Sequence, residues 1–308
     1  MLKRRPIIID TDPGIDDAAA IASAVFCESL DVKLISTVSG NVSIEHTTKN
    51  AQKLVEFFEK DIPVAKGSCR PLIKQIEDAS HIHGETGMAG YEFPEPTKKL
   101  HNKNSIEAMK EVILSSEEKI TLVPIGPLTN IALLLRTYPE VKENIEEIVL
   151  MGGSSGRGNH TPAAEFNIGA DPEAAKIVFS EDIKKVVCSL DVTSVATLDL
   201  ETINKLRNMN KIGEMFYSLF NHYRGGSILN GGLSMHDLTT IAYLDNPDLF
   251  KKVETFVDIE TGSRYTEGFM IVDFEGVYKQ EANAIFCTGI DVEGFRKWML
   301  NIFENIKL

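Results

Sequence analysis

The sequence predicts an α/β protein with an open, mostly parallel sheet flanked by helices, in a single domain spanning residues 1–308. Two observations support this prediction. Short β-rich apolar runs alternate with stretches of helical periodicity over most of the chain, which is the order of βαβ units. These runs are continuously apolar, which is typical of strands buried on both faces of a parallel sheet.

The expected elements follow one another in this alternating order. The first half predicts a strand at 7–10, a helix at about 17–27, a strand at 32–38 and a helix near 44–59. Further along we expect a strand at 120–124, a helix after Pro127, a strand near 148–151, a helix after Pro172 and a strand at 186–190.

Two long segments, 67–100 and 221–234, interrupt the alternation. Loops of this length are often functional. Ligands of parallel sheets bind at the carboxyl ends of the strands. We therefore interpret both segments as loops of an active site within the one domain.

Composition excludes several classes of protein. Hydrophobic residues make up 43% of the chain, enough for a large core. The chain has 32 basic and 45 acidic residues, a net charge of −13, and no long basic run, so we expect no nucleic-acid partner. No apolar stretch approaches the ~20 residues of a membrane span, and we expect no membrane partner.

Cysteine usage and the N-terminus predict the compartment. The four cysteines are widely separated and form no C-x-x-C pair, so neither a zinc knuckle nor a disulfide framework is indicated. The apolar stretch behind the basic residues 3–5 ends at Asp10, too early for a signal peptide. We expect a reduced, cytoplasmic protein.

An acidic cluster follows the first predicted strand. Asp10, Asp12, Asp16 and Asp17 lie within eight residues, where the strand passes into a helix. Carboxylates this close repel one another unless a cation lies among them, and a hard divalent ion is the simplest partner. The alternative is helix capping by Asp16 or Asp17, with the other carboxylates in solvent.

Two known acidic motifs were compared with this segment. A calcium-binding EF-hand loop is excluded because Ile15 and Ile21 occupy the positions that require Gly and Glu. A haloacid-dehalogenase-type phosphatase would use Asp10 as nucleophile and Asp12 for proton transfer. Against that alternative, Gly14 stands where Thr or Val is usual, and the motif does not explain the other two aspartates.

Further polar groups lie near the ends of later strands. The glycine-rich run 152–159 has neither the G-x-G-x-x-G nor the Walker A spacing. After it, Asn159, Glu165 and Asn167 could make directional hydrogen bonds to a polyhydroxylated ligand. Individually, Asn159 is typical of a turn and Glu165 of a surface charge.

Three histidines are candidates for the site. His236 and Asp237 begin a helical segment and could supply an acid beside a metal ligand, although the pair is also typical of a simple helix start. His81 and His83 lie in the first long loop, where histidines are usually ordinary polar residues.

Together these segments resemble the inosine-uridine nucleoside hydrolase family, most closely its bacterial non-specific ribonucleoside hydrolases. The resemblance rests on ordered motifs along the chain: 8–17 (IIDTDPGIDD), 38–41 (VSGN), 81–85 (HIHGE), 126–130 (GPLTN), 151–153 (MGG), 164–168 (AEFNI) and 235–237 (MHD). It implies a Rossmann-like nucleoside hydrolase fold with bound Ca²⁺, acting on the N-glycosidic bond of ribonucleosides.

The resemblance also implies roles for individual residues. The calcium ligands would be Asp12, Asp17, Asp237 and the backbone carbonyl of Ile125, where the family commonly has Thr. His236 would face the leaving base, and Asp10 would support the cluster. The residues implied to contact substrate are Asp16, Asn41, Met151, Asn159, Glu165, Asn167 and, in a loop over the base, His81.

The expected reaction releases free base and ribose from purine and pyrimidine ribonucleosides such as inosine and uridine, in nucleoside salvage. The transition state resembles an oxocarbenium ion. Asp12 would take a proton from water, and His236 would protonate, or hydrogen-bond to, the leaving base. A homodimer or homotetramer is expected from the resemblance. The alternatives are the phosphatase, a non-catalytic nucleoside sensor and a nucleoside phosphorylase.

Overall fold

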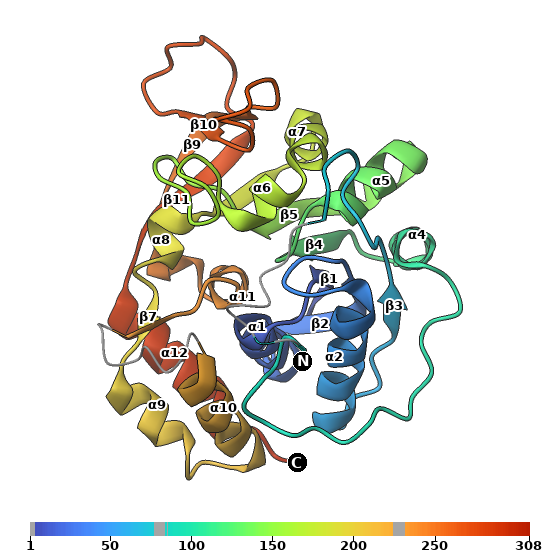
Figure 1. The fold of residues 1–308 in the computed structure, drawn as a ribbon, viewed down its shortest axis with the longest axis vertical. Coiled ribbons are helices and arrows are strands. Elements are labelled where there is room, and N and C mark those ends of the chain that lie inside the picture. The colour runs from blue at the N-terminus through green and yellow to red at the C-terminus, as the bar shows by residue number, and fades with distance from the viewer. Residues whose placement is uncertain (1–3, 77–83, 85, 224–231) are drawn as a thin grey trace.

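A computed structural model describes residues 4–76, 84, 86–223 and 232–308 (Figure 1). At its centre is a nine-stranded sheet in the order β10-β9-β11-β6-β5-β4-β1-β2-β3. The seven strands from β11 to β3 are parallel, and β9 runs antiparallel to both β11 and β10. The strands are β1 (Arg5–Thr11), β2 (Leu30–Thr37), β3 (Val64–Lys66), β4 (Ile120–Pro124), β5 (Ile145–Met151), β6 (Lys185–Cys188), β9 (Phe250–Ile259), β10 (Met270–Asp273) and β11 (Ala284–Ile290). A separate two-stranded ladder joins β7 (Thr197–Leu198) and β8 (Leu233–Ser234).

Helices cover both faces of the sheet (Figure 1). One core contains side chains of α1 (Ile15–Phe26), α2 (Ile44–Phe57), α9 (Leu200–Leu206), α10 (Lys211–His222), α11 (Leu238–Asp245) and α12 (Val292–Glu304). The core on the other face contains α4 (Ser105–Ser115), α5 (Thr129–Thr137) and α7 (Pro172–Ser180). Short helices α6 (Phe166–Ala170) and α8 (Leu190–Thr193) follow β5 and β6, and 3₁₀ turns span Pro139–Asn144 and Pro247–Leu249.

The first strand shows why the sheet is buried on both faces. Ile7 and Ile9 belong to the core under α1, whereas Ile8 belongs to the core under α5. Successive side chains of a strand point to opposite faces, so a continuous apolar run supplies both cores. The same alternation separates the next two residues, Asp10 and Thr11, and it decides which of them can reach the start of α1.

The fold class and the predicted elements are confirmed, with two differences. Leu190 does not end a strand: β6 stops at Cys188, and Ser189 caps α8 by accepting a hydrogen bond from the Asp191 backbone. The antiparallel β9–β10 pair was not predicted. Segment 67–100 contains no helix or strand in its described part, whereas segment 221–234 includes the end of α10 and all of β8.

A cavity of about 710 Å³ lies at the amino-terminal edge of the parallel strands, where β6 and β11 begin. Two of its lysines are already paired, since Lys176 contacts Asp258 and Lys184 contacts Glu147. The polar residues described below lie at the opposite edge. Within the described ranges, no helix is both long and apolar enough to cross a membrane.

Candidate active site

The candidate site lies at the carboxyl ends of β1, β4, β5 and β6. Asp12 directly follows β1, Ile125 follows β4, Met151 ends β5, and α8 follows β6. Parallel strands bring these ends to one edge of the sheet, so residues distant in the sequence meet there.

The Asp12 carboxylate is held between two loops. The backbone N–H of Asn41 donates to its Oδ2 (2.6 Å), and the Asn41 side chain donates to its backbone carbonyl (3.1 Å). A Cβ on Gly40 would lie 2.1 Å from Oδ2, and one on Gly126 would lie 2.6 Å from Oδ1. Only glycine lets both loops approach this closely. Among the described residues, the buried Oδ1 has no hydrogen-bond partner.

Asp17 is fixed at the first turn of α1. Its Oδ1 accepts from the Thr11 hydroxyl (2.6 Å), and its Oδ2 accepts from the Gly14 backbone (2.9 Å) and the Asn41 side chain (3.1 Å). Thr11 can reach it because this side chain points from β1 toward α1. Asn41, expected to contact substrate, therefore also links Asp12 to Asp17.

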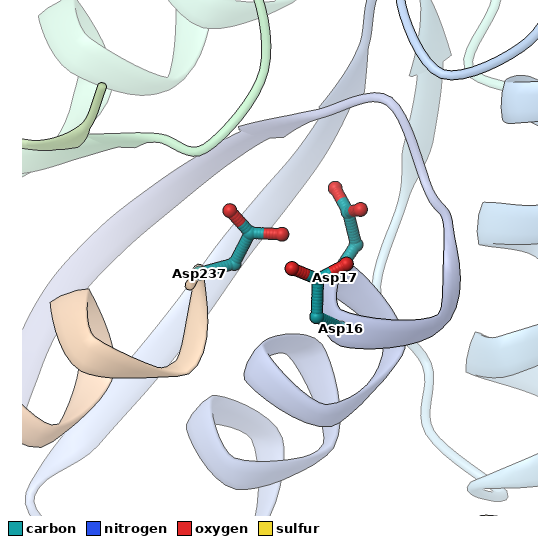
Figure 2. Close-up of side chains that lie close together, drawn as sticks. All are labelled: Asp16, Asp17 and Asp237. Carbon is teal, nitrogen blue, oxygen red and sulfur yellow. The ribbon is translucent and has the colours of Figure 1, made fainter. Parts of the chain in front are cut away.

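Three aspartates converge at the helix starts (Figure 2). Asp16 and Asp17 come from α1, and Asp237 comes from the residue before α11. Ligand atoms of all three lie within 4.8 Å of one another, and all three residues are buried. The structure therefore places a third carboxylate, Asp16, beside two of the expected metal ligands.

Burial and repulsion from neighbouring carboxylates raise the pKa values of Asp12, Asp17 and Asp237. The pKa of Asp12 is raised well above its ordinary value by burial, then by Asp17 and Asp16. The pKa of Asp17 is raised to about 6 by burial and by Asp16. Burial and the other three aspartates likewise raise the pKa of Asp237. A cation among them would relieve the repulsion.

Asp10 lies apart from this cluster. Its Oδ1 accepts from the hydroxyl of Ser36 and from the Asn130 side chain (2.8 Å), on the α5 face of the sheet. The side chain is fully buried, and this burial raises its pKa to about 7. From the sequence we expected Asp12, Asp16 and Asp17 to converge and Asp10 to support their cluster, but the alternation of β1 turns Asp10 to the face opposite Thr11.

Asn167 and Glu165 join the ends of β4 and β5. The Asn167 amide donates to the carbonyl oxygens of Ile125 (3.1 Å) and Met151 (3.2 Å). Glu165 caps α6, accepting from the backbone of Asn167 and Ile168, and it also accepts from Gly153. Glu165 is only 2% exposed, and burial raises its pKa. It is therefore not the surface charge that its sequence position suggested.

The other predicted site residues differ in burial and in their contacts. Asn159 is exposed, and its side chain accepts from the Phe166 backbone (2.9 Å) at the start of α6. His236 is buried next to Asp237, and its Nδ1 lies 2.8 Å from the Thr193 hydroxyl. His81 lies outside the described residues.

The donor set suits a hard cation. Asp12, Asp17, Asp237 and the Ile125 carbonyl offer oxygen atoms only, the ligand type that Ca²⁺ and Mg²⁺ prefer. The unpartnered, buried Oδ1 of Asp12 gives an independent sign, since a buried charged oxygen without a partner is costly. The residues present therefore fit a divalent metal.

Several residues that shape the site were not identified from the sequence. Thr11, Ser36 and Thr193 are hydroxyl residues at or near the ends of β1, β2 and α8, where nothing in the sequence distinguishes a site residue from an ordinary strand or helix residue. Asn130 lies in the recognised GPLTN motif, but no role was predicted for it. A polar residue at a strand end is the only signal that could have found Thr11.

Comparison with known proteins gives concordant matches. The family described as inosine-uridine preferring nucleoside hydrolase matches residues 7–297. Non-specific ribonucleoside hydrolase RihC of Salmonella typhi is 52% identical over 300 residues, covering 97% of this chain and 98% of that protein. The same enzyme of Salmonella newport (strain SL254) is 52% identical over 297 residues, 96% of this chain and 97% of that protein.

Two solved structures have the same fold over their whole length. A purine-preferring ribonucleoside hydrolase from Gardnerella vaginalis superposes with a TM-score of 0.92 at 26% identity, covering 98% of this chain and 99% of that one. An inosine-guanosine nucleoside hydrolase superposes with a TM-score of 0.92 at 28% identity, covering 99% and 100%.

Proposed function

The chain belongs to the inosine-uridine preferring nucleoside hydrolase family, and from that premise we propose a Ca²⁺-dependent hydrolase of both purine and pyrimidine ribonucleosides. It is a ribonucleoside N-ribohydrolase, which releases free base and ribose. The proposed action on both purine and pyrimidine ribonucleosides is supported by the 52% identity to a non-specific ribonucleoside hydrolase. The observation that carries the chemistry is the buried group of Asp16, Asp17 and Asp237, of which Asp237 directly follows His236 in the chain, and whose charges act on the buried Asp12.

In this proposal the metal is held by Asp12, Asp17, Asp237 and the carbonyl of Ile125. When bound, the ion supplies positive charge that attracts ribose hydroxyls and water and makes that water more acidic. Asn41 and Asn167 hold the protein ligands in place, since Asn41 bonds two of the carboxylates and Asn167 bonds the carbonyl.

Asp12 is the proposed general base. Its Oδ2 is fixed by Asn41, while its buried Oδ1 has no partner among the described residues and could accept a proton. In the reaction, water adds to C1′ and passes a proton to Asp12 as the C1′–N bond breaks. His236 donates a hydrogen bond to the departing base and stabilises the negative charge that develops on it, and the base takes up a proton from solvent on release.

The ribose side is assigned to Asp16, Asn41, Met151, Asn159, Glu165 and Asn167. Buried carboxylates near the sugar would stabilise the positive charge that develops on the ribosyl ring. Because that charge exists in the transition state and not in the substrate, such stabilisation accelerates the reaction. His81, beyond the described residues, stays a predicted contact to the base.

The phosphatase alternative is disfavoured by the position of Asp10. A nucleophilic carboxylate must reach its substrate, but this side chain is 0% exposed and bonded to Ser36 and Asn130. The single domain, the homodimeric or homotetrameric state and the cytoplasmic location stay predictions.

The test is release of base and reducing sugar from inosine and uridine in phosphate-free buffer, with chelator and then with added Ca²⁺. Calcium-dependent ribose release from both substrates supports the proposal. Release from one substrate only would contradict the breadth, and release without Ca²⁺ would contradict the metal. A requirement for phosphate would indicate a phosphorylase, and activity only on phosphate esters would indicate the phosphatase.

A further inference from the structure

His236, the residue proposed to act on the leaving base, is in hydrogen-bond contact with Thr193. The Thr193 hydroxyl is 2.8 Å from Nδ1 of the ring, and Thr193 is fully buried, while His236 is 8% exposed. A neutral imidazole carries its proton on one nitrogen only, and the hydrogen bond at Nδ1 determines which. The direction of this bond therefore indicates which nitrogen carries the proton.

The surroundings of Thr193 indicate the direction of the bond. A helical threonine commonly donates its hydroxyl to the carbonyl four residues earlier, which here is that of Ser189. That carbonyl already accepts from the backbone N–H groups of Val192 (3.0 Å) and Thr193 (2.9 Å). Because a carbonyl oxygen has two lone pairs, this local acceptor is filled. The hydroxyl proton is then directed to Nδ1.

We propose that Thr193 is a positioning residue for base departure: its hydroxyl donates to Nδ1 of His236, which keeps the proton of the neutral ring on Nε2. The inference rests on the proposed function, in which His236 donates to the leaving base. With the proton on Nδ1 instead, Nε2 would present a lone pair, which cannot donate a hydrogen bond to the base.

Both partners are held independently of their mutual contact. The carbonyl of His236 accepts from the Thr239 hydroxyl (2.6 Å), which fixes the backbone that carries the ring. On the other side, Leu190 of α8 donates its backbone N–H to the Gly153 carbonyl (2.9 Å), and Asp191 accepts from the Ser155 backbone (2.9 Å). Thr193 therefore extends from a helix that is already fixed, as a positioning residue must.

The kinetic experiment compares two substrates that differ in their need for a donor to the leaving group. The base of inosine leaves poorly without a hydrogen-bond donor, whereas p-nitrophenyl riboside releases a stable phenolate without one. We would measure kcat and KM for wild type, Thr193→Val and Thr193→Ser. Thr255→Val is the matched control, because Thr255 is also buried but lies in β9, and its hydroxyl has no partner in the described structure.

For Thr193→Val we expect kcat on inosine to fall about 30-fold, a part of the ~100-fold or more that general acids contribute. We expect KM to stay within about twofold, since uniform binding is retained. Activity on p-nitrophenyl riboside should stay near wild type, Thr193→Ser should recover most of the inosine activity, and Thr255→Val should match wild type. Equal loss on both substrates, or no loss on inosine, would overturn the proposal.

A spectroscopic measurement tests the contact without turnover. In protein labelled with ¹⁵N-histidine, the nitrogen shifts of His236 report which nitrogen carries the proton, with His236→Gln identifying its signals. We expect the Nε2–H form in wild type and a mixture of forms in Thr193→Val. An Nδ1–H ring in wild type would refute the inference. Inactivity of wild type on all nucleosides would instead refute the proposed function, which leaves the two failures distinguishable.

Discussion

Gly40→Ala offers a direct test of how Asp12 is positioned. The added Cβ would lie 2.1 Å from Oδ2 of Asp12 and 2.9 Å from Cδ of Pro127. Real Cβ contacts are essentially never shorter than 3.0 Å, so the carboxylate must move by about 0.9 Å. The bond from the Asn41 backbone to the same oxygen would be disturbed as well.

The expected loss follows from that displacement. A misplacement of about 1 Å at a reacting group can cost on the order of 100-fold in rate, which corresponds to about 2.7 kcal/mol of transition-state stabilisation. The fold should survive, because overpacking of this kind costs roughly 1–3 kcal/mol. We therefore expect a folded protein with a kcat reduced about 100-fold.

The assay is initial-rate ribose release from inosine at saturating Ca²⁺, with thermal unfolding measured in parallel. Gly156→Ala is the control, because a Cβ at that glycine meets no atom within 4 Å. It should retain wild-type kcat. If Gly40→Ala kept its kcat within about threefold of wild type, the position of Asp12 would not limit the rate, and its role as base would be refuted.

Three further predictions concern single buried groups. Asp12→Asn should lose far more activity than metal affinity, measured by kcat and calorimetric titration with Ca²⁺; equal losses would reduce Asp12 to a ligand. Asn130→Ala should lower the free energy of unfolding, measured by urea denaturation, by about 3 kcal/mol. The reason is that Asp10, the Thr37 carbonyl and the Ser68 N–H each lose a buried hydrogen-bond partner. A loss below about 1 kcal/mol would contradict this reasoning. Burial lowers the pKa of Lys185 from 10.5 to about 8, so the folded protein loses this proton at a lower pH than the unfolded chain does. The free energy of unfolding of wild type, relative to that of Lys185→Met, should therefore rise between pH 8 and pH 10.5. A difference that does not change with pH would show that this lysine titrates normally.

Much of the parallel sheet was predictable because burial on both faces produces a readable pattern. The apolar run of β4 predicted its bounds of Ile120–Pro124 as the structure has them. The antiparallel β9 was not predicted, since its first half alternates little and remains exposed. Strands of this kind bury one face or less, and their sequences carry a weaker signal.

The acidic cluster was predictable in composition but not in membership. Spacing in the sequence grouped Asp10 with Asp12, whereas Asp10 points from β1 to the α5 face and Asp12 lies beyond the end of that strand, where it bonds to Asn41. Asp237 joins Asp16 and Asp17 only because α11 begins beside α1, a tertiary contact that no local spacing encodes. The bond between Thr193 and His236 spans 43 residues and depends on the same kind of packing.

The burial of Asp12, Asp16, Asp17 and Asp237 also couples the folding equilibrium to dissolved cations. A folded chain that binds a cation its unfolded form does not bind gains RT ln(1 + [L]/Kd), about 2.7 kcal/mol at a hundredfold excess over Kd. For a chain of this size that is a rise on the order of 5 °C in melting temperature. Thermal shift is therefore a measure of cation preference in which no nucleoside takes part, and chelation should expose the repulsion among the four carboxylates as lost stability.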